Sequence, residues 1–386
     1  MEIEGLTREN KVQKILYVRS GPYQVNPTSY NLQEVGLATA FAKKGIQCDI
    51  MYYHKTRNFN QTISKGSEQV TIFWRKGLKL CRSGIYPKIL KKDFLAQYDA
   101  IIISEYSQIM SVLLSLKHPN VYIYNGPYYN LFKIPYIEPI YDRLFIPFLN
   151  KHVKMIFSKT KRAESYLNHK GLTKTKVTGV GLDFDKMDNH INDKTQILLD
   201  KMADHQNLLY IGSIDKRKNT AFLFQVFKQL KQEDKYKHLQ LVLVGKGKKA
   251  YIDYCKRLVD DTILADIILV ERIENAQTHF VYEKCDVFLL PSLQEIFGMV
   301  LLEAMFSKCS IISSNSAGAE TLLSDSKAGI IMEKFDVQAW AQQITNLLDN
   351  PGLRKELGDK AHQTIIEDFN WDIIAHKMIE GITIND

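Results

Sequence analysis

The chain has 386 residues, which is enough for two domains of ordinary size. Its apolar fraction of 45% and charged fraction of 24% are typical of soluble globular proteins, and no apolar run reaches the roughly 18 residues needed to cross a bilayer. The five scattered cysteines form no C-x-x-C pair, and the polar, acidic start is not a secretory signal. These features argue against a disulfide framework and a structural zinc site and predict a cytoplasmic protein.

Charge is unevenly distributed: residues 1–190 have a net charge of +13 and residues 191–386 a net charge of −5. The densest basic stretch is Trp74–Lys92, in which seven cations and no acid are interleaved with aromatic and aliphatic residues. This composition suits an anionic membrane surface at the inner face of the cell membrane or an anionic lipid-linked substrate, with a solvated basic face as the alternative. No recognisable nucleic-acid module accompanies the stretch, so no nucleic-acid partner is expected.

In chain order, the first half alternates apolar runs with helical spacing. The apolar run Lys14–Val18 precedes a loop at Ser20–Pro27, and the helical spacing over Leu32–Lys44 stops at Gly45. Further strands are predicted at Cys48–Tyr53, Ala100–Ile103 and Val121–Tyr124.

The second half repeats this alternation. A helix is predicted at Ala221–Gln232. Strands are predicted at Leu208–Ile211, Leu239–Val244, Ile267–Val270, Val287–Leu290 and Ser310–Ser313. Strands that alternate with helices indicate parallel sheets covered on both faces, and two such sets indicate an α/β protein with two doubly wound domains. Ligands of such domains bind beyond the carboxyl ends of the strands.

The boundary between the domains is predicted between residues 183 and 208, where the segment 189–204 is mostly polar. We assign residues 1–185 to the first domain and residues 205–369 to the second. An amphipathic helix is predicted over about residues 370–386, and we expect it to pack back on the first domain.

Two glutamates eight positions apart, Glu295 and Glu303, follow the predicted strand Val287–Leu290. The pattern indicates strand, loop and helix, with Gly298 where the loop turns into the helix, Glu295 at the helix mouth and Glu303 about two turns inside. Backbone N–H groups at a helix mouth suit a phosphate, and carboxylates suit the hydroxyls of a sugar or ribose. A capped helix with an acidic residue at each end of its first turns is the structural alternative.

Two further loops follow predicted strands. Gly212 and the basic run Lys216–Lys218 come before a helix, which suits a diphosphate clamp, although a basic cluster in a loop is more often simply solvated. The small-residue run Asn315–Glu320 opens another helix and is again a candidate anion or hydroxyl site.

In this order, the motifs resemble glycosyltransferase family 4 and its relatives, the retaining group 1 glycosyl transferases of the GT-B fold. The resemblance spans nearly all of residues 207–375, whereas the first 150 residues match only in architecture. It implies two doubly wound, Rossmann-like domains that face each other across a cleft. Its strongest segments are Gly212–Asn219, Val244–Gly247, Tyr282–Ser292, Glu295–Met305 and Ala317–Glu320.

The resemblance also implies a role for each matching residue. Glu303 would accept hydrogen bonds from the ribose of a nucleotide sugar, and Glu295 would contact the donor sugar. Lys218 would neutralise the diphosphate, with Arg217 as its substitute. Gly21 would face the acceptor and the phosphates across the cleft. The rest of the donor site would be formed by Gly212, Arg272, Ile273, Phe297, Gly298, Met299 and Val300.

The chain departs from the family pattern at four positions. Ser213 stands where an arginine is usual, and Asn219 where a glycine is usual. Ile296 replaces one glycine of the glutamate block. Asn125 stands where many members have a histidine that contacts the donor sugar, so a catalytic role for Asn125 competes with that of a tight Asn-Gly turn.

Together these features imply a metal-independent, retaining hexosyltransferase with no cofactor, whose donor is a nucleotide diphosphate sugar, with a UDP-sugar favoured and a GDP-sugar the alternative. The acidic run Asp183-Phe184-Asp185 is not expected to bind a metal, because it is short and coincides with a segment that the family also has. The basic first half predicts a lipid-linked or growing cell-surface polysaccharide as the acceptor. Two other functions stay open: a nucleotide-sugar epimerase of the same fold and a catalytically silent sugar-nucleotide-binding subunit.

Overall fold

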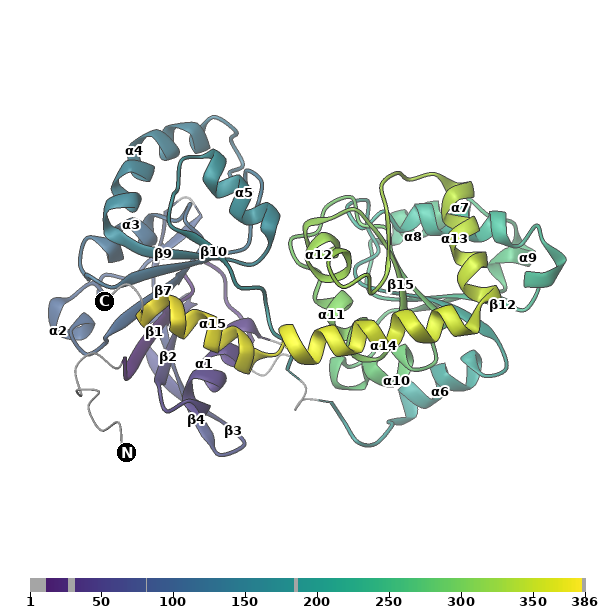
Figure 1. The fold of residues 1–386 in the computed structure, drawn as a ribbon, viewed down its shortest axis with the longest axis horizontal. Coiled ribbons are helices and arrows are strands. Elements are labelled where there is room, and N and C mark those ends of the chain that lie inside the picture. Colours follow the sequence, from purple (N-terminus) through teal and green to yellow (C-terminus); the bar gives the residue numbers. More distant parts are fainter. Residues whose placement is uncertain (1–11, 27–31, 81, 184–186, 384–386) are drawn as a thin grey trace, which may run out of the picture. The chain divides into compact units, whose positions relative to one another are not determined.

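The computed structural model describes residues 12–26, 32–80, 82–183 and 187–383 and divides the chain into two compact units (Figure 1). One unit consists of Met1–Gly181 with Asn370–Asp386, and the other of Leu182–Phe369. Each unit is a mainly parallel sheet covered by helices, which confirms the predicted α/β class with two doubly wound domains.

The first unit is built on an eight-stranded sheet of order β10-β9-β8-β7-β1-β2-β4-β3, in which only the β3–β4 pair is antiparallel. The central strands β1, β7 and β8 are buried almost throughout, because helices cover both faces of the sheet. The strands are β1 (Lys14–Val18), β2 (Gln47–His54), β3 (Phe59–Lys65), β4 (Glu68–Lys76), β7 (Ala100–Ser104), β8 (Val121–Asn125), β9 (Val153–Ser158) and β10 (Thr175–Val177), with the small hairpin β5 (Leu78–Leu80) and β6 (Ser83–Ile85) beside them.

The C-terminal helix belongs to the first unit. Trp371, at the start of α15, packs so closely on Gly36 and Gly181 that a side chain at either glycine would overlap its indole ring. Near the other end of the helix, Tyr122 donates a hydrogen bond to the carbonyl oxygen of Ile382 (3.2 Å). α15 therefore covers the sheet on the same side as α1, opposite α3, α4 and α5 (Figure 1). The helices are α1 (Gln33–Lys43), α2 (Lys92–Leu95), α3 (Ile109–Ser115), α4 (Ile137–His152), α5 (Lys161–His169) and α15 (Trp371–Thr383).

The second unit has a six-stranded, fully parallel sheet of order β13-β12-β11-β14-β15-β16. The strands are β11 (Gln206–Ile211), β12 (Leu239–Val244), β13 (Ile267–Val270), β14 (Val287–Leu290), β15 (Ser310–Ser314) and β16 (Ile330–Met332). The helices are α6 (Asp193–Met202), α7 (Thr220–Leu230), α8 (Lys249–Lys256), α9 (Asp261–Leu264), α10 (Thr278–Tyr282), α11 (Met299–Phe306), α12 (Ala317–Ala319), α13 (Val337–Asp349) and α14 (Pro351–Asp368).

The structure differs from the sequence prediction in two segments. The polar segment 189–204, interpreted as a boundary, contains helix α6, whose apolar residues Leu198, Leu199 and Met202 are buried in the second unit. The β3–β4 hairpin was not predicted, because only Phe59 and Ile63 of β3 are apolar and none of its residues is buried, so its sequence has no clear strand pattern. Phe184 and Asp185 of the acidic run lie outside the described residues.

Candidate functional site

The sheet of the second unit reverses its strand order between β11 and β14, so the loops that follow these two strands lie next to each other. In doubly wound sheets this switch point is where ligands bind. Two hydrogen bonds join the loops: the backbone N–H of Leu293 donates to the carbonyl oxygen of Arg217 (2.9 Å), and the side-chain Nη1 of Arg217 donates to the carbonyl oxygen of Gln294 (3.1 Å). The predicted phosphate clamp and the predicted glutamate block therefore meet at one edge.

Lys218 and Glu295, 77 positions apart in the chain, form a short ion pair at this edge, with side chains only 11% and 13% exposed. The loop around the lysine is fixed by Asp215, which accepts hydrogen bonds from the backbone N–H of Lys218 (2.8 Å) and from Ser213 Oγ (2.6 Å). Burial alone would raise the pKa of Asp215, but these hydrogen bonds lower it, so the carboxylate is charged at neutral pH. The ammonium group is thus held in place before any ligand arrives.

Two residues with positive φ shape the loops. Asn219, which follows the lysine, has φ 53°, a left-handed conformation that asparagine adopts more readily than most residues other than glycine. This explains why asparagine can stand there in place of the glycine usual in the family. Gly298 has φ 79° and precedes the first residue of α11, Met299, as predicted. Because α11 begins at Met299, Glu303 lies about one turn inside the helix rather than two.

Glu303 is buried, with 7% of the residue exposed. Its Oε2 accepts a hydrogen bond from the hydroxyl of Tyr282 (3.2 Å), a residue of α10 that is itself 1% exposed. The tyrosine therefore fixes the orientation of the carboxylate on the first turns of α11. Phe297 is also buried, whereas Val300, the second residue of α11, is partly exposed.

The predicted loop Asn315–Glu320 lies against the loop that follows β14. Ser314 Oγ donates to the carbonyl oxygen of Ser292 (2.6 Å), and Ser316 Oγ accepts from the N–H of Ala319 (3.2 Å) at the start of α12. Gly318 packs so tightly on the carbonyl oxygen of Phe297 that a Cβ atom at this position would overlap it. The three loops singled out from the sequence therefore form one continuous edge.

Arg272 and Ile273 follow β13 on the outer side of the same edge. Arg272 is exposed and Ile273 is buried. The N–H of Gly245 donates to the carbonyl oxygen of Val270 (2.8 Å), and a Cβ atom on Gly245 would overlap the carbonyl oxygen of Gly212. The glycines thus bring the ends of β11, β12 and β13 together. A base-binding role for Arg272 and Ile273 stays a prediction.

Two predicted residues lie in the first unit. Gly21 follows β1 at the switch point between β1 and β7, and the ring of Tyr23 occupies the space that a side chain at Gly21 would need. Asn125, at the end of β8, is fully buried; its Oδ1 accepts from the N–H of Tyr106 (3.3 Å) and its Nδ2 donates to the carbonyl oxygen of Pro127 (2.9 Å). These bonds hold the side chain of Asn125 in place within the first unit, and a contact of Asn125 with the donor sugar stays a prediction.

Sequence reasoning missed a buried polar cluster at the same edge of the first unit. Glu34 Oε2 accepts hydrogen bonds from Arg19 Nη1 (3.3 Å) and the Tyr52 hydroxyl (3.2 Å). Nearby, Lys159 Nζ donates to Gln33 Oε1 (2.7 Å), and burial lowers the pKa of Lys159 from 10.5 to about 8 although Glu34 acts to raise it. Perturbed groups of this kind often mark functional sites. The sequence feature that could have revealed this cluster is the position of Lys159 directly after an apolar strand.

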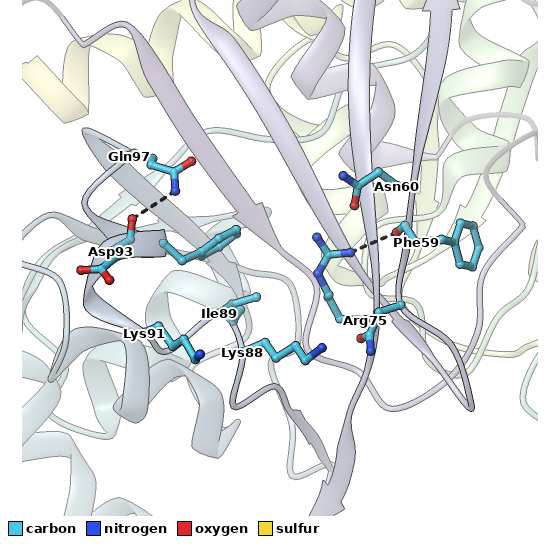
Figure 2. Close-up of a pocket in the computed structure, with 10 residues that line it drawn as sticks. Phe59, Asn60, Arg75, Lys88, Ile89, Lys91, Asp93 and Gln97 are labelled. Carbon is cyan, nitrogen blue, oxygen red and sulfur yellow. Dashed lines mark hydrogen bonds between the residues drawn. The ribbon is translucent and has the colours of Figure 1, made fainter.

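The basic stretch Trp74–Lys92 surrounds a hollow of about 690 Å³ between the β3–β4 hairpin and the segment around α2 (Figure 2). Arg75, Lys88 and Lys91 line it, and within the described part of the chain none of the three forms an ion pair. Arg75 Nη1 donates to the carbonyl oxygen of Phe59 (3.0 Å), and burial lowers the pKa of this guanidinium group. Asp93 also lines the hollow but forms no ion pair with any of the three, so the lining carries three cations against one carboxylate.

Comparison with solved structures places this architecture in the GT-B fold of glycosyltransferases. A trehalose-6-phosphate structure from E. coli bound with UDP-2-fluoro glucose superposes with a TM-score of 0.70, covering 96% of this chain and 99% of that chain at 14% identity.

The resemblance predicted from the motifs is confirmed: residues 199–364, all within the second unit, match the family model of glycosyl transferases group 1. The D-inositol 3-phosphate glycosyltransferase of Paenarthrobacter aurescens is 23% identical over 59% of this chain and 56% of its own length. The capsular polysaccharide biosynthesis glycosyltransferase CapM of Staphylococcus aureus is 27% identical over 51% of each chain. The chain thus matches about half the length of these curated relatives.

Proposed function

We propose that the chain is a retaining glycosyltransferase that moves a hexosyl unit from a nucleotide diphosphate sugar to an acceptor hydroxyl, with no metal and no cofactor. The observation that supports this most is the ion pair of Lys218 with Glu295 beside the N-terminus of α11, at the switch point of the second unit. A cation and a helix N-terminus together favour a diphosphate, and a carboxylate beside them favours a sugar hydroxyl.

In the proposed reaction, the bond between the anomeric carbon of the donor and the diphosphate oxygen breaks. The acceptor oxygen bonds to the same face of that carbon, and the acceptor proton passes to the departing diphosphate oxygen. Negative charge builds up on the diphosphate, and Lys218 and the first N–H groups of α11 stabilise it without reorganising. As Lys218 turns from Glu295 to the diphosphate, the freed carboxylate accepts hydrogen bonds from the transferred sugar.

The donor's nucleoside occupies the same edge. Glu303, oriented by Tyr282, accepts hydrogen bonds from the ribose hydroxyls, and the segment Arg272–Ile273 holds the base. UDP is the favoured nucleotide, and the UDP-2-fluoro glucose bound to the E. coli structure supports this choice. GDP is the alternative.

The acceptor is a lipid-linked or growing cell-surface polysaccharide, which the chain meets as a peripheral protein at the inner face of the cell membrane. The name of the staphylococcal relative, a capsular polysaccharide biosynthesis glycosyltransferase, supports a polysaccharide acceptor. The unpaired cations Arg75, Lys88 and Lys91 support an anionic group on it, because a hollow encloses a phosphate or carboxylate better than a flat bilayer.

A nucleotide screen followed by product analysis tests the proposal. Thermal unfolding of the purified chain with UDP, GDP or ADP should single out one nucleotide, since stabilisation grows with the ratio of ligand concentration to Kd. Incubating the matching sugar nucleotide with an acceptor should give a glycoside of unchanged anomeric configuration. If the chain binds the nucleotide but neither transfers nor hydrolyses the sugar, it is a silent subunit. If the chain epimerises the donor sugar without an acceptor, it is an epimerase.

A further inference from the structure

The outer face of α4, the helix that follows β8 in the first unit, carries large apolar side chains that nothing covers. Tyr136, Ile140 and Leu144 are 79%, 60% and 62% exposed, and Ile134 in the preceding loop is 56% exposed. Because residues four apart lie on one side of a helix, the three form a row. Contiguous exposed apolar residues of this kind mark an interaction surface. Among the described residues, no helix is long and apolar enough to cross a membrane.

The charged residues around this row have one sign. Lys133, Arg143 and Lys151 are exposed beside it. The two acids of the helix turn inward instead, and both pair with Lys170 of the region following α5: Glu138 at 3.1 Å and Asp142 at 2.5 Å. The outer face of α4 therefore carries apolar and positive groups and no free carboxylate of its own.

A small apolar hollow of about 180 Å³ opens along the same face. Ile140 and Leu144, both exposed, form part of its wall, and Phe132 and Phe145 lie deeper. Its other lining residues include Arg82, whose guanidinium group is paired with Glu105 (2.8 Å). The face is therefore indented where its apolar side chains are densest, which gives room for part of an acyl chain.

We propose that this face, formed by Lys133, Ile134, Tyr136, Ile140, Arg143, Leu144 and Lys151 and called the α4 face below, docks the protein on an anionic bilayer surface. The apolar row enters the boundary between headgroups and acyl chains, while the three cations reach the anionic headgroups. The inference rests on the proposed function in one respect: a lipid-linked acceptor is reached at such a surface.

Charge favours a bilayer over a second copy of this chain. In a twofold symmetric dimer the same patch would meet itself, so the three cations would face their own equivalents. The α4 face offers a bilayer more apolar surface than the stretch Trp74–Lys92, in which Trp74, Tyr86 and Ile89 are buried and Leu78 and Leu80 are exposed.

The test is co-sedimentation of the purified chain with vesicles of phosphatidylcholine alone or with about 30% phosphatidylglycerol, without donor or acceptor. We expect binding to the anionic vesicles. The double variant Ile140→Asn with Leu144→Asn should bind at least about tenfold more weakly, because two apolar side chains no longer enter the bilayer. The double variant Arg143→Glu with Lys151→Glu should lose the preference for anionic vesicles, at roughly fivefold for each cation removed.

Matched controls keep the outcome interpretable. Ile197→Asn alters an exposed isoleucine of the second unit, and Lys88→Glu with Lys91→Glu reverses charge in the basic hollow; both should bind vesicles like the wild type. Unchanged binding by both α4-face variants would overturn the proposal, as would a wild-type dimer that the apolar double variant converts to a monomer. The vesicle assay contains no substrate, so a failure to bind vesicles would not contradict the proposed transferase activity. A chain that binds vesicles but transfers no sugar would contradict the transferase proposal and leave the docking proposal intact.

Discussion

The carboxyl edge of the second sheet and the basic hollow of the first unit differ in how their charges are balanced. In the second unit, Lys218 is paired with Glu295, and Glu303 accepts a hydrogen bond from Tyr282. In the first unit, Arg75 and its two neighbouring lysines line a hollow without any carboxylate partner among the described residues. A site whose ligand enters and leaves with every turnover benefits from internal partners that hold its side chains in place. The basic hollow lacks such partners, as expected of a surface whose anionic ligand supplies the missing negative charge. The first three predictions below test this contrast.

The largest effect is expected at the carboxyl edge of the second sheet, called the paired edge below because Lys218 is paired there with Glu295. Lys218→Ala removes the cation beside the diphosphate, and the transfer rate should fall by about 10²–10³-fold, as when a preorganised charge partner is removed from other active sites. Steady-state transfer assays measure the change. The exposed neighbour Lys216 provides the control, since Lys216→Ala should stay within about twofold of the wild type. A fully active Lys218→Ala variant would contradict the proposed role of the ion pair.

Gly318→Ala should distort the same edge through packing alone. The added methyl group overlaps the carbonyl oxygen of Phe297, so the free energy of unfolding should fall by about 1–3 kcal/mol. Denaturant unfolding of the purified variant gives this value. Gly352→Ala is the matched control, because its methyl group meets nothing and a helical alanine should be neutral or slightly stabilising. Equal stability of both variants would mean that the loop can move away from Phe297.

Substitutions in the basic hollow should change the KM for the acceptor rather than the KM for the donor. Arg75→Ala with Lys88→Ala should raise the KM for an anionic acceptor about tenfold while the KM for the donor stays unchanged, because two charge-assisted contacts are lost. Lys92→Ala, an exposed lysine outside the hollow lining, is the control. An equal rise in the donor KM would contradict the proposed difference between the basic hollow and the paired edge.

The last prediction concerns pH and lies outside both regions. Burial lowers the pKa of Lys159 to about 8, so between about pH 8 and 10.5 the unfolded chain holds a proton that the folded chain has released. The free energy of unfolding should therefore gain up to about 1.4 kcal/mol per pH unit from this group over that window. Lys159→Met should remove this contribution, as urea unfolding at pH 7.5, 8.5 and 9.5 would show. Parallel curves for the variant and the wild type would mean that the lysine keeps an ordinary pKa.

The paired edge could be predicted from sequence because its parts are short-range. Each loop directly follows an apolar strand, and Gly212, Gly298 and Gly318 stand where backbone conformation or close packing demands glycine. Parallel strands then bring these loops to one edge. The start of α11 at Gly298 was predicted, but the depth of Glu303 was overestimated by about one turn, because it was counted from Glu295 rather than from Met299.

The first unit was less predictable because its features depend on contacts between distant segments. The inward turn of Glu138 and Asp142 depends on Lys170, which comes from beyond the next helix. The low pKa of Lys159 depends on burial, which composition does not reveal. For the same reason, Trp74–Lys92 suggested a surface in the sequence, whereas pairing of β4 with β2 and β3 buries its aromatic residues and gathers its cations around a hollow.

The packing of Trp371 on Gly36 and Gly181 has a consequence for biosynthesis. The whole second unit lies between the two segments that form the first unit, so during translation the second sheet can close while the first still lacks its last helix. Domains generally fold as units while the chain emerges. A chain interrupted after Phe369 would carry a finished second unit and a first unit whose tryptophan-binding surface remains open to solvent. Packing of α15 therefore completes the first unit only after the whole second unit has been synthesised.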